Sequence, residues 1–196
     1  MKIENIKSNK DNLISDLFLI SPEIFHDSRG YFYESWNKDI FNKAIGKEIN
    51  FMQDNQSSSL KGVLRGLHYQ INPYPQGKLI RCLKGEIFDV AIDLRKSSNT
   101  FCEWTGIFLN EENKKQLWIP EGFAHGFLTI SSKADVLYKT NNFWNKDHER
   151  CIKWNDKKLG IKWPLNNINM INPTISIKDE NGASLDEAIS NFEIFK

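Results

Sequence analysis

The chain contains 196 residues, with 26 lysines and arginines against 25 aspartates and glutamates, which gives a formal net charge of +1. Hydrophobic residues make up 40% and charged residues 26% of the sequence, as is ordinary for a globular protein with one core. This balance argues against a nucleic-acid-binding protein, and no apolar run is long enough to cross a membrane.

The N-terminus and the cysteines predict a cytoplasmic protein. Residues 1–7 contain no apolar signal core. Cys82, Cys102 and Cys151 lie at irregular spacing, without a Cys-x-x-Cys pair. We therefore expect free thiols in a reducing compartment rather than a disulfide or zinc framework.

The first third of the sequence predicts two strands, a helix and a loop. Residues 12–24 are mostly apolar and read as a strand that ends at Pro22. A turn at 26–30 leads to a second strand over 31–36. Apolar residues at helical spacing predict a helix over 39–45, and the serine-rich residues 57–59 are expected to form a loop.

From Val63 onward the predicted strands are short and frequent. They cover residues 78–83, 87–95, 103–109, 116–119, 126–130 and 136–140. In the strand over 87–95, apolar residues alternate with mostly polar ones, so one face is dry. Because no helical patterns separate these strands, we expect an all-β sandwich or barrel rather than βαβ units.

The C-terminal residues 166–196 form a tail of different character. Residues 166–181 are polar and irregular, whereas residues 184–187 match a capping box at the start of a helix. The apolar residues that follow give this terminal helix one apolar face. No repeat or linker divides the chain, so residues 1–196 are expected to form one domain with the tail packed on it.

Three side chains that could act together lie in the segment 62–81. Arg65, His68 and Lys78 are surrounded by apolar, strand-forming residues. Cations are seldom buried without a partner, so the pattern predicts a pocket that receives an anion and transfers protons. The competing interpretation of His68 is a core histidine held by a hydrogen bond, which is the commoner case for a histidine considered alone.

Strict strand alternation would place Arg65 and His68 on opposite faces of a sheet. Gly66 lies between them, and a glycine inside a strand often marks a β-bulge. A bulge at this point would return both side chains to one face.

Three further residues are candidates, and each has a simpler structural interpretation. His125 follows a turn rich in glycine and proline, and its simpler role is to hold that turn. Tyr138 offers a phenol that can donate a proton, but it also suits packing in a sheet. Asp179 lies in the polar tail, where most carboxylates are solvated.

Taken together, these segments resemble the dTDP-4-dehydrorhamnose 3,5-epimerase family. No single segment is specific, but their combination and order are. The matching stretches are residues 25–35, 53–55, 62–70, 76–79, 88–95, 117–127, 137–139, 154–156 and 161–164.

The resemblance implies a cupin-type jelly roll that forms a homodimer. It implies an isomerase that converts dTDP-4-dehydro-6-deoxy-D-glucose to dTDP-4-dehydro-L-rhamnose, in dTDP-L-rhamnose biosynthesis. His68 would be the general base, oriented by Asp179, and Tyr138 the general acid on the opposite side of the sugar. Lys78 would be the cation beside the sugar oxygen that gains charge.

The resemblance also implies a set of residues that contact the nucleotide sugar. They are Arg29, Glu34, Gln53, Asn55, Arg65, His125, Glu149 and Lys178. The chain departs from the family pattern in two places. The segment 165–175 is longer than usual, so the assignment of Lys178 and Asp179 depends on where the insertion lies, and Phe143 and Trp144 stand where tyrosines are common.

The expected chemistry needs no cofactor. A hydrogen beside a ketone leaves and returns as a proton, because the charge is shared with the carbonyl oxygen as an enolate. The sequence has no Gly-x-Gly-x-x-Gly loop for a redox cofactor. Many cupins hold a metal through a His-x-His pair, but His68 is followed by Tyr69 and Gln70, so no metal is expected.

Two alternatives stay open at this point. One is a relative that epimerises a single carbon, C3 or C5, or a 3,4-ketoisomerase acting on a related nucleotide-linked 4-keto-6-deoxy sugar. The other is a non-catalytic cupin that binds a nucleotide sugar.

Overall fold

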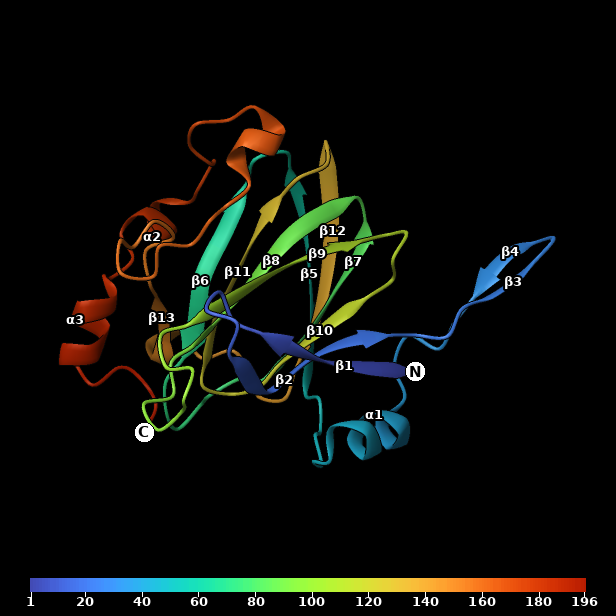
Figure 1. The fold of residues 1–196 in the computed structure, drawn as a ribbon, viewed down its shortest axis with the longest axis horizontal. Helices are drawn as coiled ribbons and strands as arrows, with labels where there is room; N and C mark the ends of the chain where they lie inside the picture. Colours follow the sequence, from blue (N-terminus) through green and yellow to red (C-terminus); the bar gives the residue numbers. More distant parts are fainter.

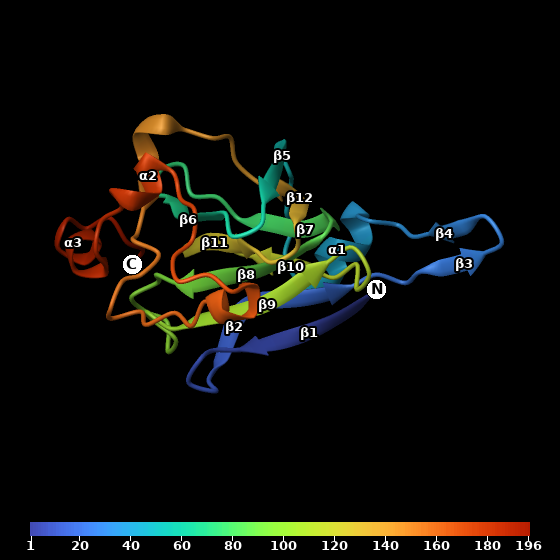
Figure 2. The same cartoon turned by 90° about the horizontal axis from the view of Figure 1, so that it is seen from above.

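Two antiparallel sheets face each other in the computed structural model, which describes all 196 residues (Figure 1). The larger sheet has six strands in the order β1-β2-β10-β7-β12-β5, and the smaller has five in the order β13-β6-β11-β8-β9. Short helices lie outside the sheets (Figure 2). The expected all-β class with a few short peripheral helices is confirmed.

The strands of the six-stranded sheet are β1 (Lys2–Lys7), β2 (Leu13–Ser21), β10 (Gln116–Ile119), β7 (Lys78–Lys84), β12 (Lys133–Thr140) and β5 (Gln53–Leu60). Those of the five-stranded sheet are β13 (Glu149–Cys151), β6 (Leu64–Gln70), β11 (Phe123–Thr129), β8 (Glu86–Asp93) and β9 (Trp104–Asn110). A separate hairpin pairs β3 (Phe25–Asp27) with β4 (Gly30–Phe32). The helices are α1 (Lys38–Ile45), α2 (Ile177–Glu180) and α3 (Leu185–Ser190), with 3-10 turns at Lys146–His148 and Leu165–Ile168.

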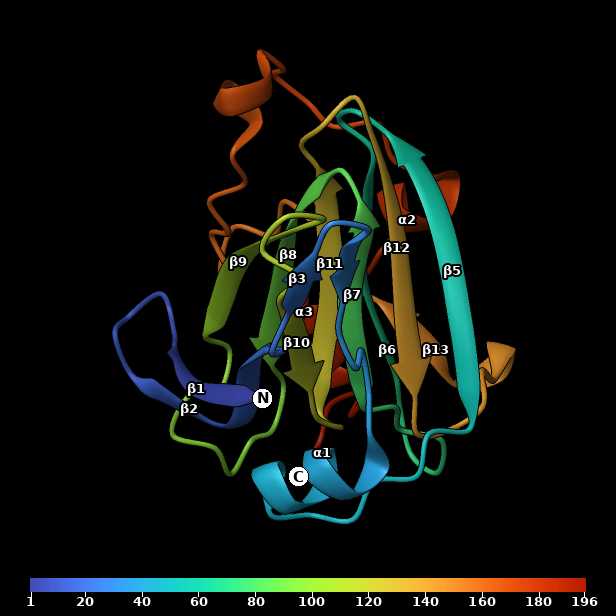
Figure 3. The same ribbon diagram turned by 90° about the vertical axis from the view of Figure 1, so that its right-hand side faces the viewer.

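Hydrophobic clusters lie between the two sheets and on the outer face of each. The space between the sheets is filled by a cluster that includes Leu17, Ile80 and Leu117 from one sheet and Leu109 and Phe127 from the other. Helix α1 covers the outer face of the six-stranded sheet, and the C-terminal tail covers the outer face of the five-stranded sheet. Figure 3 shows β7, β12 and β5 side by side at the edge of the larger sheet.

Strand β8 places its polar face inward. Its dry face, which includes Val90 and Ile92, packs against the tail rather than against the opposite sheet. The alternate face carries Asp89 and Asp93, and both residues are 0% exposed. Burial of a carboxylate is costly unless it is paired, and these two are paired with His125 and Arg95.

Several predicted boundaries need correction. The serine-rich residues expected to form a loop belong to β5, which pairs with β12 along its whole length. Strand β11 begins at Phe123 rather than at Gly126, so His125 lies inside the strand and not just before it. The strand expected over 31–36 ends at Phe32 in β4. Strand β1 at the N-terminus was not predicted.

The predicted helices α1 and α3 are confirmed, and both begin with side-chain caps. The Asn37 side chain accepts a hydrogen bond from the Ile40 amide, and α1 ends at Gly46 with φ of 70°, a left-handed conformation that suits glycine. Ser184 and Glu187 form the reciprocal capping box at the start of α3. No helix of the structure is long and apolar enough to span a membrane.

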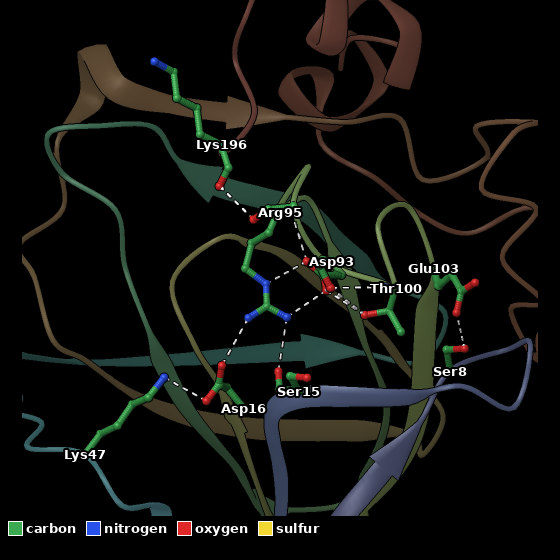
Figure 4. Close-up of polar contacts among 11 residues, drawn as sticks. Ser8, Ser15, Asp16, Lys47, Asp93, Arg95, Thr100, Glu103 and Lys196 are labelled. Carbon is green, nitrogen blue, oxygen red and sulfur yellow. Dashed lines mark hydrogen bonds and ion pairs between the residues drawn. The ribbon is translucent and has the colours of Figure 1, made fainter.

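Arg95 ties the end of β8 to the start of β2 (Figure 4). Its guanidinium donates to Asp93 at 2.8 and 2.9 Å, to Asp16 at 3.3 Å and to the Ser15 carbonyl at 3.2 Å. The Thr100 hydroxyl also donates to Asp93, at 2.8 Å. Burial acts to raise the pKa of Asp93, but these donors outweigh it and hold the pKa below its ordinary value.

We expect Arg95→Ala to lower the free energy of unfolding by about 3–5 kcal/mol, since it leaves the buried Asp93 carboxylate without its cation. Urea unfolding followed by fluorescence measures the change. Lys158→Ala is the control, because its ion pair with Asp186 is 64% and 59% exposed and should contribute nothing measurable. Equal effects of the two substitutions would contradict this account of Arg95.

Candidate active site

A cavity of about 260 Å³ opens between the two sheets, and side chains from both line it. From the six-stranded sheet come residues of β5, β7 and β12: Gln53, Asn55, Ser57, Lys78 and Tyr138. From the five-stranded sheet come residues of β6, β11 and β13: Arg65, His68, His125, Phe127 and Glu149. Gln76 and Trp144 complete the lining from loops. The lining is mainly polar and contains cationic, titratable and phenolic groups.

His68 and Asp179 form a hydrogen-bonded pair at one wall of the cavity. His68 Nε2 lies 2.5 Å from Asp179 Oδ1, and the Gly66 amide donates to the other carboxylate oxygen at 3.3 Å. Burial acts to raise the pKa of Asp179, but the hydrogen bond and charge of His68, together with hydrogen bonds from Gly66 and Ser176, outweigh it, so the pKa lies below its ordinary value. Asp179 is therefore an ionised partner for the imidazole. The alternative of a solvated tail carboxylate is wrong, since Asp179 is 3% exposed.

A short helix holds Asp179 in place. The Ser176 side chain caps α2 by accepting a hydrogen bond from the Asp179 amide at 3.1 Å. The next segment runs beside β13, where Ile152 forms a bridge with Ala183. The tail thus brings its carboxylate to a histidine that lies 111 residues earlier in the chain.

Arg65 and His68 line the same cavity, as the expected interruption at Gly66 requires. The pairing of β6 with β11 is irregular between His125 and Phe127, and Gly66 has φ of 121°. A side chain at Gly66 would also collide with the backbone of β11, since a Cβ atom at this position would lie 2.6 Å from the Gly126 Cα. Glycine at this position permits the close approach that brings the two side chains together.

His125 forms a second buried pair, with Asp89 of β8. Its Nε2 lies 2.9 Å from Asp89 Oδ2, and the pair lies beneath the cavity. Burial lowers the pKa of His125 below its ordinary value, although Asp89 acts in the opposite direction. A neutral ring that donates to Asp89 leaves its other nitrogen as a hydrogen-bond acceptor.

Lys78 is an almost fully buried ammonium at the cavity, 7% exposed. Its Nζ donates to the main-chain carbonyl of His68 at 3.2 Å. Burial lowers its pKa to about 8, against the opposing effects of Glu149 and Asp89. The ammonium is therefore charged at neutral pH and can meet an anionic oxygen.

Tyr138 enters the cavity from the sheet opposite to the one that carries His68. It is directly paired with Asn55 across β12 and β5, and Gln53 lies two residues away on the same face of β5. Burial raises the pKa of Tyr138 above its ordinary value, with a further contribution from Glu149. The phenol is therefore protonated at neutral pH and able to donate.

Glu149 and Lys178 form an ion pair of 2.6 Å at the rim. Burial acts to raise the pKa of Glu149, but the hydrogen bond and charge of Lys178, with smaller contributions from Trp144 and His68, together hold it below its ordinary value. Trp144 lies next to them with 54% of its surface exposed, and its amide donates to Gln53 at 3.0 Å. An exposed indole at a cavity rim offers a flat surface for stacking.

Two of the expected contact residues lie away from this cavity. Arg29 lies at the tip of the β3–β4 hairpin, 88% exposed, and its side chain is bonded to Asp27. Glu34 follows the same hairpin and bonds only to Asn37. The hairpin projects from the body of the molecule in both views (Figures 1 and 2), so it does not reach the cavity of its own chain.

Some residues of the site were not foreseen from the sequence, namely Asp89 behind His125 and several lining residues. Asp89 was counted only as part of a polar strand face, although an acidic residue in an otherwise apolar strand is a signal of pairing. Ser57 was assigned to a loop, but it shares the inward face of β5 with Gln53 and Asn55. Its Oγ is buried and has no hydrogen-bond partner. No feature of the sequence indicated that Gln76 and Phe127 line the cavity.

The arrangement can move protons on both sides of a bound ring. An imidazole with a carboxylate behind it lies on one sheet, and a protonated phenol lies on the other. A buried ammonium lies at the same cavity, where it can stabilise charge that develops on an oxygen. Arg65 adds a guanidinium suited to phosphate oxygens.

Comparisons with known proteins identify one family. The family model described as dTDP-4-dehydrorhamnose 3,5-epimerase matches residues 11–187. The enzyme of that name from Shigella flexneri is 54% identical over 175 residues, which cover 89% of this chain and 94% of the relative. Its counterpart from Pseudomonas aeruginosa is 52% identical over 175 residues, 89% of this chain and 94% of the relative.

Solved structures show the same architecture. The epimerase of Legionella pneumophila, in complex with dTDP-4-keto-L-rhamnose, aligns with a TM-score of 0.88 and 41% identity over 100% of this chain and 98% of that one. The Mycobacterium tuberculosis epimerase aligns with a TM-score of 0.93 and 31% identity, over 100% and 94% of the two chains. The fold is thus the expected cupin-type jelly roll. The chain belongs to the dTDP-4-dehydrorhamnose 3,5-epimerase family.

Proposed function

We propose that this protein converts dTDP-4-dehydro-6-deoxy-D-glucose to dTDP-4-dehydro-L-rhamnose by inverting C3 and C5, without a cofactor. The observation that carries the proposal is the placement of His68 and Tyr138 on opposite sheets around one cavity. Inversion needs a base on one face of the sugar and an acid on the other. The Legionella relative bound to dTDP-4-keto-L-rhamnose supports the same substrate class here.

His68 is the base in this proposal. Its Nε2 is engaged by Asp179, which leaves Nδ1 to accept a proton from the carbon beside the ketone. The resulting imidazolium is stabilised by the ionised carboxylate behind it. Asp179 therefore orients the ring and compensates the charge it acquires, without touching the sugar.

Lys78 and Tyr138 act after the proton has left. Lys78 stabilises the negative charge on the enolate oxygen. Because this charge is absent from the bound substrate and develops only during the reaction, its stabilisation lowers the activation barrier. Tyr138 then delivers a proton to the opposite face of the same carbon. Repetition at the second carbon completes the double inversion.

The substrate's nucleotide is held at the rim. Arg65 and Lys178 supply positive charge for the diphosphate, and Gln53, Asn55 and Glu149 offer hydrogen bonds to the sugar and base. His125 contributes its free ring nitrogen beneath the sugar.

We further propose that the protein is a homodimer in which the β3–β4 hairpin reaches the cavity of the second copy. The hairpin exposes Phe25 at 56%, Tyr31 at 56% and Phe32 at 70%, an apolar surface that a second copy would cover. This arrangement would give Arg29 and Glu34 the ligand contacts that they cannot make within their own chain. The three free cysteines accord with a cytoplasmic location.

Proton NMR in deuterated water tests the reaction. With a dTDP-4-keto-6-deoxyglucose substrate, we expect solvent deuterium to enter C3 and C5 as the L-rhamno product forms. Incorporation at one carbon only would indicate a monoepimerase, and hydrogen transfer between C3 and C4 a ketoisomerase. Tight binding of the substrate with no incorporation at any carbon would leave only a nucleotide-sugar-binding protein and would end the proposal.

We also expect kcat/KM to decline as the pH rises above about 8, the pKa of Lys78. The sign follows from the charge: the ammonium is present below this pKa and lost above it, and the enolate loses its counter-charge. Tyr138 does not produce this limb, because its pKa is raised above its ordinary value. A pH profile of Lys78→Met provides the control, since this variant should be slow throughout and lack the alkaline limb near pH 8. An alkaline decline near pH 8 in Lys78→Met as well would contradict the assignment of this decline to Lys78.

A further inference from the structure

Cys151 lies beside the His68–Asp179 pair, and the proposed reaction does not use it. It is the direct cross-strand neighbour of His68 in the β13–β6 pair, where opposed side chains lie close together. Its Sγ lies 3.8 Å from Asp179 Oδ1, the same oxygen that His68 Nε2 approaches to 2.5 Å. The three ligand atoms all lie within 4.8 Å of one another.

A sulfur, an imidazole nitrogen and a carboxylate oxygen form a donor set that suits zinc. In a tetrahedral zinc site, bonds of about 2.0–2.3 Å place neighbouring ligand atoms roughly 3.3–3.6 Å apart. The nitrogen–oxygen and sulfur–oxygen distances, 2.5 and 3.8 Å, lie on either side of this range. Small side-chain rotations would therefore bring all three atoms to coordination distance.

An ion can approach His68 and Asp179 from a second hollow. This hollow of about 430 Å³ is bounded by residues 174–176, has His68 and Asp179 in its wall, and shares Arg65 and His68 with the catalytic cavity. Two cations also line it, but each is engaged. Lys178 is paired with Glu149 at 2.6 Å, and Arg65 donates to the Ser59 hydroxyl at 3.0 Å.

We propose that a divalent transition metal of the Zn²⁺ type binds to Cys151, His68 and Asp179 and thereby inhibits the enzyme. The bond to sulfur releases the thiol proton to solvent. The bond to Nε2 leaves the ring's single N–H proton on Nδ1, which is the atom that accepts a proton in the proposed reaction. The metal thus occupies one nitrogen of the base and keeps the other protonated, while water completes its coordination. The binding site stands independently of the proposed function, but inhibition rests on it.

Cobalt spectroscopy tests binding without reference to activity. Co²⁺ added to the purified full-length protein should produce a thiolate-to-cobalt charge-transfer band and the visible spectrum of tetrahedral cobalt. Cys151→Ala should abolish the charge-transfer band, and Cys151→Ser serves the same purpose where the smaller residue impairs folding. Cys102→Ala is the matched control and should retain it. Absence of the band in the wild type, or its persistence in Cys151→Ala, would overturn the site.

Inhibition is then measured with Zn²⁺ in the epimerase assay. We expect Zn²⁺ to inhibit the wild type and Cys102→Ala equally, and Cys151→Ala more weakly by roughly tenfold or more, since even outer partners of metal ligands contribute that much. Mg²⁺ should have no effect, because it prefers an all-oxygen octahedral site. Equal inhibition of Cys151→Ala and wild type would overturn the inhibitory role. A cobalt band in a protein without epimerase activity would confirm the site while refuting the proposed function.

Discussion

His68→Ala is expected to lower kcat by roughly 10²–10⁴-fold and to abolish deuterium incorporation at both C3 and C5, because no other group can take the proton on that face. Rapid-quench assays and proton NMR in deuterated water measure the two effects. Binding of the nucleotide should change little, because the groups proposed to hold it lie elsewhere on the wall.

Two further variants make this result decisive. His148→Ala removes a histidine of the 3-10 turn whose ring bonds to Asn145 and packs against Tyr74, outside the cavity lining, so turnover should stay at the wild-type level. His68→Asn keeps a donor for Asp179 and protects against a loss of fold caused by an unpaired buried carboxylate. Near-normal turnover in folded His68→Asn would exclude His68 as the base.

Tyr138→Phe is expected to separate proton exchange from inversion. The base remains, so an enolate still forms and solvent deuterium still enters the substrate. Without the phenol, the proton returns mainly from the face it left, and formation of the L-rhamno product should decline by roughly 10²–10⁴-fold. Proton NMR distinguishes labelled starting sugar from product in a single experiment.

Tyr69→Phe is the matched control, since Tyr69 packs in the cluster beneath the tail, on the outer face of the five-stranded sheet and away from the cavity. It should turn over at the wild-type rate. Loss of exchange and inversion together in Tyr138→Phe would show that Tyr138 helps to form the enolate, which would contradict its role as an acid acting on the opposite face.

Parts of the fold could be predicted because local physics decides them. The helix at 38–45 is set by its apolar spacing and caps, and the terminal helix by its capping box. Strand β5 could not be predicted from the sequence, because Gln53–Leu60 is almost entirely polar. It is a strand because β12 supplies hydrogen bonds along its length and because its inward polar face meets a cavity instead of a dry core.

The candidate site, too, could be predicted from the sequence only in part. Arg65, His68 and Lys78 lie within one short stretch, so their proximity could be inferred, and Gly66 pointed to the irregularity that unites them. Asp179 could not be placed from spacing, since nothing local links a polar tail to a distant strand. Its position was available only through the family resemblance. The proposed role of Arg29 requires a second chain, about which one sequence carries no geometric information.

The tail that carries Asp179 has a consequence for biosynthesis. Both strands bearing His68 and Tyr138 are translated well before the short helix at 177–180 that delivers the carboxylate. The strands of both sheets are complete at Cys151, so a nascent polypeptide lacks the partner of its imidazole until translation is nearly finished. Termination between Cys151 and codon 179 would remove this carboxylate together with the part of the tail that covers the dry face of β8, so turnover requires synthesis of the full chain.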